Sequence, residues 1–248
     1  MEILMIVLIV LLILFAMWLY KKVLTKQTKM RLGITQILND GSIVEAMDQE
    51  IMASSHLPFD GDLLASFFAT YLTMRESKGA GNWVGLLSAY LFQWEVDGLI
   101  QTTIDEDNQL QFTFYEAELT SEIELELYDI LKSNGGISFD DELLKNWSRK
   151  VLAFGEYILL ESGNVAFDIK NRIRFTKEGY HKSLDHGRFA KYWMDVDWAA
   201  FSKLSDQRQK EELSFAMLYE LTEEIEGFIE GGGASSEMLE IANRVWRF

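Results

Sequence analysis

The sequence predicts a mainly helical α+β protein with an N-terminal transmembrane helix, two winged-helix-like units in tandem and a helical C-terminal segment. Three observations predict this fold class. A single long apolar run lies at the N-terminus, from Ile3 to Tyr20. Only one proline, Pro58, occurs in 248 residues, so long stretches are free to be helical. A change from helical to strand periodicity then occurs twice along the chain.

The first element is a membrane anchor, which we assign to residues 1–22. The run from Ile3 to Tyr20 contains only apolar and aromatic residues, and as a helix it would be about 27 Å long, close to the hydrocarbon thickness of a bilayer. A cleaved secretory signal is the alternative. Such a signal needs a basic start and a small-residue cleavage site. Only Met1-Glu2 precede the run, and no small-residue pair follows it, so we expect the helix to be retained.

The residues at the end of the run predict its orientation. Trp18 and Tyr20 suit the headgroup layer, and Lys21 and Lys22 begin a basic flank that should remain cytoplasmic and contact anionic lipid. We therefore expect a single-pass protein of the cell membrane with a cytoplasmic C-terminal part. The absence of cysteine agrees with a reducing compartment.

Charge favours a protein partner over nucleic acid for the rest of the chain. The net charge is −16, and the first 31 residues hold five Lys or Arg and one Glu, so the remainder carries −20. The negative electrostatic field of such a chain opposes general binding of nucleic acid, which is itself negatively charged.

Residues 23–62 read as a basic flank and linker. The turn signal Asn39-Asp40-Gly41 and the break at 54–58 interrupt this polar stretch.

The first winged-helix-like unit is predicted over residues 63–118. The apolar spacing predicts one helix over 63–74 and a second over about 83–96, with Asn82 as its N-cap. Alternating patterns over 99–104 and 110–115 then predict a hairpin.

The second unit, over residues 119–180, repeats this order. We predict helices over 119–131 and 140–160, the latter broken near Gly155, and a hairpin of 165–169 with 172–176.

The helical C-terminal segment covers residues 181–248. One predicted helical segment holds Phe189 to Phe201, whose aromatic side chains either enter the core or lie on the bilayer. A second covers Leu213 to Ile229, a glycine-rich run begins at Gly231, and a short helix follows over 237–246, capped by Ser236.

Several short motifs resemble a known family. These are Ser88-Ala89-Tyr90-Leu91, Asp97-Gly98-Leu99-Ile100, Phe175-Thr176-Lys177-Glu178-Gly179, and the stretch from Gly187 to Tyr219 with Phe189, Tyr192 and Trp198. Together they resemble the cytoplasmic C-terminal part of a bacterial family of predicted membrane proteins of unknown function, over Trp83 to Gly233. We expect the chain to differ from that family in lacking a large extracellular domain before the anchor and an internal pair of membrane spans. The resemblance implies a location and no activity.

Site chemistry is sparse. The chain has no cysteine and three histidines, of which His181 and His186 are five residues apart and so lie on different faces of a helix. Phosphate-binding glycine loops, dinucleotide fingerprints and nucleophile elbows are absent from the sequence. We therefore expect no enzyme activity, metal site, cofactor or small-molecule ligand.

One region is basic although the chain as a whole is acidic. From Lys145 to Lys191 there are ten Lys or Arg and five Asp or Glu. In a winged helix, the cations on the second helix and the wing are placed to contact DNA or a partner. They are Lys145, Arg149, Lys150, Lys170, Arg172 and Arg174. The alternative is that they pair with surface carboxylates or face the membrane.

Two functional hypotheses follow. The first is a membrane-anchored, acidic cytoplasmic domain that binds a protein without catalysis. The second is a membrane-tethered winged-helix transcription regulator that binds DNA through the basic region.

Overall fold

A computed structural model describes residues 52–74, 83–104, 110–116, 118–137, 142–167, 171, 173–233 and 236–246. The predicted anchor, with Trp18, Tyr20, Lys21 and Lys22, lies outside these residues, as do Asn82, Lys170 and Arg172. Within the described ranges, no helix has the length and apolar character needed to cross a membrane.

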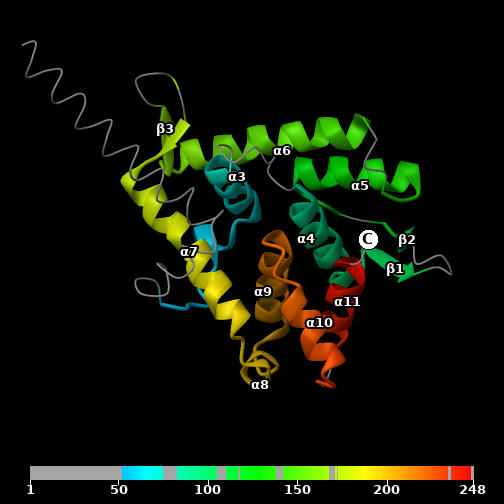
Figure 1. Cartoon of the computed structure of the whole chain (residues 1–248). Coiled ribbons are helices and arrows are strands. Elements are labelled where there is room, and N and C mark those ends of the chain that lie inside the picture. The colour runs from blue at the N-terminus through cyan, green and yellow to red at the C-terminus, as the bar shows by residue number, and fades with distance from the viewer. Residues whose placement is uncertain are drawn as a thin grey trace, which may run out of the picture.

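The described part is a mainly helical α+β fold, as predicted (Figure 1). Its small sheets are two antiparallel hairpins, β1 with β2 and β3 with β4. In chain order the elements are the 3-10 turn η1 (Pro58–Gly61), α3 (Leu63–Met74), α4 (Trp83–Val96), β1 (Ile100–Ile104), β2 (Leu110–Phe114), α5 (Glu122–Asn134), α6 (Glu142–Glu161), β3 (Val165–Phe167), β4 (Ile173–Phe175), α7 (Lys177–Met194), α8 (Trp198–Phe201), α9 (Asp206–Leu218), α10 (Glu223–Glu230) and α11 (Glu237–Trp246).

The order helix, helix, hairpin occurs twice, and the two copies leave their second helix in the same way. After α4, Gly98 has φ +72° and Leu99 N donates to Trp94 O at 2.7 Å. After α6, Gly163 has φ +69° and Asn164 N donates to Leu159 O at 2.9 Å. These are Schellman-type helix ends, in which glycine adopts the left-handed conformation cheaply.

The two hairpins are also closed by equivalent backbone hydrogen bonds. Tyr115 N donates to Leu99 O, and Thr176 N donates to Asn164 O, both at 3.0 Å. Residues of α4 and α6 therefore correspond with an offset of 65 positions.

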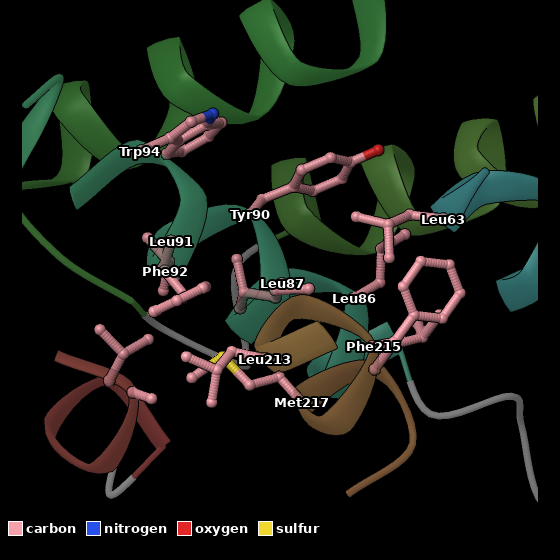
Figure 2. Close-up of a cluster of buried hydrophobic side chains, with 14 of the residues drawn as sticks. Leu63, Leu86, Leu87, Tyr90, Leu91, Phe92, Trp94, Leu213, Phe215 and Met217 are labelled. Atoms are coloured by element: carbon pink, nitrogen blue, oxygen red, sulfur yellow. The ribbon is translucent and has the colours of Figure 1, made fainter. Parts of the chain in front are cut away.

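The core surrounds α4, whose residues from Gly85 to Phe92 are all buried. Figure 2 shows its leucines and aromatic residues packed against Leu213, Phe215 and Met217 of α9. Gly85 permits this packing, because a Cβ there would lie 2.6 Å from Leu218 O. A second cluster joins Phe59 to α3, α6 and β3 through Phe68, Leu159 and Val165.

Three sequence predictions about helix continuity are wrong. The helix α6 is continuous through Gly155. This glycine lets α3 approach closely, since a Cβ there would lie 2.5 Å from Phe68 Cβ. The stretch 189–201 is divided between α7 and α8. The stretch 213–229 is divided between α9 and α10, where Glu220 has φ +59° and Trp193 Nε1 donates to Leu221 O at 2.8 Å. These turns are fixed by tertiary contacts that local periodicity does not report.

Hydrogen bonds hold the segment before α3 against α7 and α9. Ser54 N donates to Arg188 O at 3.1 Å, and Arg208 donates to Ser55 O. Within η1, Phe59 is buried with φ +49°, and Asp60 forms an ion pair with Lys182 at 3.0 Å. The chain thus enters the fold through a fixed, strained turn.

Candidate protein-interaction surface

The most buried histidine has a structural position. The ring of His186 in α7 packs against the ring of Tyr219 at an interplanar angle of 46°, with centroids 3.8 Å apart, and its Nδ1 lies 3.5 Å from Thr70 Oγ1. Burial lowers the pKa of His186 to about 4. Within the described part of the chain, no group of three or more His, Cys, Asp or Glu is arranged to hold a metal ion.

A buried carboxylate links α7 to α9. Glu212 accepts hydrogen bonds from Tyr192 Oη at 3.0 Å and from Arg208 Nε at 2.8 Å. Burial raises the pKa of Glu212, and burial together with the Glu212 carboxylate raises the pKa of Tyr192 to about 12. Since one carboxylate oxygen is engaged by Tyr192 of α7 and the other by Arg208 of α9 itself, this group holds the two helices together and presents no open site.

A second polar network fastens the last helix. Arg244 of α11 pairs with Glu95 of α4, and its Nε donates to Thr102 Oγ1 of β1 at 2.9 Å. The Glu95 side chain is only 7% exposed. An unpaired carboxylate at this depth would be costly, so Arg244 fixes α11 against α4 and β1.

The structure brings three of the predicted basic contacts to the N-terminal half of α6 and places the fourth, Arg174, half-buried on β4. Lys145 pairs with Glu142 at 3.3 Å and Lys150 with Glu126 at 2.7 Å, while Arg149 Nη1 donates to Asn146 Oδ1 at 2.9 Å. Lys170 and Arg172 are outside the described residues. Two of these cations therefore neutralise carboxylates of α5 and α6.

The outer face of α6 exposes large apolar side chains. Leu143 is 51% exposed, Phe154 38%, Tyr157 60%, and Phe167 on the adjoining strand β3 52%. Lys150 and Glu161 lie on the same face of the helix and are also exposed. We define the α6 surface as these residues: Leu143, Lys150, Phe154, Tyr157, Glu161 and Phe167. Figure 1 shows α6 along one edge of the molecule, with α3 and α5 on the same side of it.

The corresponding face of the first unit is covered. With the offset of 65, Phe154 corresponds to Ala89 and Tyr157 to Phe92, and both α4 residues are fully buried. The helices α9 and α11 pack on α4. In the described part of the chain, the outer face of α6 is therefore exposed, whereas the equivalent face of α4 is covered by α9 and α11.

Sequence reasoning singled out the cations of α6 and missed its aromatic residues. The signal was present in the spacing, because Lys150, Phe154, Tyr157 and Glu161 recur at steps of four, three and four. The helix itself was predicted, but no role was assigned to these aromatic residues.

The chain matches none of the known protein-family models, and comparison with the curated proteins and with the solved structures gave no significant match.

Proposed function

We propose that this chain is a single-pass membrane protein whose cytoplasmic part is an acidic, non-catalytic protein-interaction domain made of two winged-helix-like units and a helical C-terminal segment. The observation that carries the proposal is the α6 surface. It exposes four large apolar side chains beside the charged residues Lys150 and Glu161, a composition that suits a protein partner. The buried ionic clusters around Glu95 and Glu212 are instead engaged within the fold.

The membrane location rests on the sequence. The apolar run from Ile3 to Tyr20 followed by Lys21-Lys22 supports an anchor with its basic flank inside the cell. The family resemblance over Trp83 to Gly233 supports the same side of the membrane. The twofold order of helix, helix and hairpin supports the winged-helix-like units.

Fractionation of cells tests the anchor. The full chain should sediment with membranes and resist extraction by high salt, whereas a chain lacking residues 1–22 should remain in the supernatant. Recovery of the full chain in the supernatant would refute the anchor.

Site-specific photocrosslinking tests the interaction surface. A photoreactive residue at position 157 should give discrete protein adducts in cells, whereas the same residue at the exposed Ser202 on the turn after α8 should give none or a diffuse set. Equal adducts at both positions, or none at 157, would contradict a binding role for the α6 surface.

A membrane-tethered DNA-binding regulator is the second candidate, because α6 holds the place of a recognition helix and carries the exposed Arg149. The full chain in detergent should then bind duplex DNA at low salt, and Arg149→Gln with Arg174→Gln should weaken binding and reduce its salt dependence. Absence of retention at low salt would remove this candidate.

A further inference from the structure

We propose that the α6 surface binds the α6 surface of a second copy of this chain, with the two helices antiparallel across a twofold axis. The inference rests on the proposed function in treating this surface as protein-binding, and it names the partner. It does not depend on the anchor.

The spacing of the exposed residues reads the same in both chain directions. Lys150, Phe154, Tyr157 and Glu161 are separated by four, three and four residues and lie on one helix face. An antiparallel copy centred between residues 155 and 156 therefore places Phe154 against Tyr157 of the partner subunit. It also places Lys150 against Glu161 of the partner subunit; the Lys150 side chain pairs with Glu126 of its own chain at 2.7 Å and is still 55% exposed. The result is an aromatic centre with an ion pair at each end.

The two remaining apolar residues fit the same arrangement. Leu143 lies near the N-terminal end of α6, and Phe167 lies on β3 just beyond its C-terminal end. Antiparallel pairing brings the end with Leu143 next to the end with Phe167 of the partner subunit. The four exposed apolar side chains of the α6 surface then face the other copy, whereas Leu125 of α5, which is 43% exposed, does not belong to this surface.

Charge along α6 selects the antiparallel direction. The N-terminal half of α6 holds three cations and Glu142, a net charge of +2, whereas the C-terminal half holds Glu156 and Glu161, a net charge of −2. Antiparallel copies bring these halves of opposite sign together, and parallel copies bring like charges together.

The same charges explain why two copies of a chain with net charge −16 can meet here. With Glu142 at its N-terminus, α6 holds three cations and three anions and is locally neutral. Elsewhere the acidic excess opposes self-association.

The expected affinity is modest. One helix pair buries less than the roughly 1,600 Å² of a standard interface. Two copies anchored in one membrane would share a small volume, and this confinement raises their effective concentration.

Charge reversal provides the test, with the full chain in a mild non-ionic detergent. Sedimentation equilibrium should show a reversible dimer. Lys150→Glu and Glu161→Lys should each weaken the dimer by at least about tenfold, because each places like charges opposite one another. The double variant restores the ion pair across the interface but not the Lys150–Glu126 pair within the chain, and it should recover the wild-type dimer. Such recovery would show that neither substitution prevents folding. A monomeric wild type, or a dimer that neither single variant weakens, would overturn the proposal.

Disulfide trapping tests the direction and register, because the chain has no cysteine of its own. After mild copper-phenanthroline oxidation, a mixture of Lys150→Cys and Glu161→Cys chains should crosslink more than either variant alone. Stronger crosslinking of each variant with itself would overturn the antiparallel arrangement. Adducts at position 157 that contain other proteins, together with a monomeric chain, would refute this inference and leave the proposed function standing.

Discussion

The close crossing of α3 and α6 at Gly155 gives the sharpest test of the fold. A methyl group at this position would lie 2.5 Å from Phe68 Cβ and 2.9 Å from Leu64 O. Neither atom can move without shifting the backbone of α3. Gly155→Ala should therefore separate the two helices, although alanine is otherwise the better helix former.

The magnitude follows from two opposing terms. Overpacking a core position costs about 1–3 kcal/mol, and here one neighbour is a backbone carbonyl, so the upper end of that range applies. Replacing a helical glycine by alanine returns up to about 1 kcal/mol. We expect a net loss of about 2 kcal/mol in the free energy of unfolding, or a melting temperature about 4–8 °C lower.

Gly227 in α10 provides the matched control. It is exposed, and a Cβ there would have no neighbour within 4 Å among the atoms of the described structure. Gly227→Ala should therefore gain the whole of the roughly 1 kcal/mol by which alanine favours a helix over glycine, and raise the melting temperature by about 2–4 °C. Thermal unfolding followed by circular dichroism on wild type and both variants decides the matter. If Gly155→Ala is as stable as the wild type, the packing of α3 on α6 is not as described.

Three further variants test other contacts. Gly85→Ala should cost about 2 kcal/mol, because its Cβ would meet the carbonyl of Leu218; an unchanged urea midpoint would contradict the packing of α4 on α9. Arg244→Met should cost about 2–3 kcal/mol by leaving Glu95 unpaired, and adding Glu95→Gln should recover part of it; additive losses in urea titrations would show that the two residues are not coupled. Since the pKa of His186 is about 4 in the fold and 6.5 in the unfolded chain, only the unfolded chain takes up this proton between those values. Stability should therefore fall by up to about 3 kcal/mol as the pH drops from 6.5 to 4, and His186→Gln should abolish that part of the loss; an identical pH profile for the variant would refute the burial of this ring.

The helices and hairpins of the two units could be predicted from the sequence because their signals are local. Apolar residues at helical spacing predicted α3 and α4 with the bounds that the structure gives, and alternating residues predicted both hairpins. The left-handed glycines at the ends of α4 and α6 were readable as breaks between helix and strand.

What local pattern could not give is the packing between distant segments. Gly155 looked like a helix breaker because its partner, Phe68, is far away in the sequence. Glu220 carries no turn signal of its own, and the hydrogen bond from Trp193 to Leu221 helps to hold the chain there. Whether the cations of α6 pair with surface carboxylates was left open by the sequence, because Glu126, on the preceding helix, could not be assigned to Lys150.

The candidate surface illustrates the same limit. Phe154 and Tyr157 have the spacing of core residues, and only the arrangement of α3 and α5 shows that they face outward. Sequence spacing alone does not show whether an aromatic residue on a helix is buried; the elements packed around the helix decide it.

The turn at Phe59 and Asp60 determines where mechanical load would enter the protein. A pull on the chain ahead of Met52 is resisted first by the backbone bond from Ser54 to Arg188, then by the Asp60–Lys182 ion pair and the buried phenylalanine ring. Force is thereby delivered to α7 and to the cluster beneath η1, while α11 is fastened elsewhere through Arg244. In a single-molecule stretching experiment, the entry segment should yield before the central helix α4.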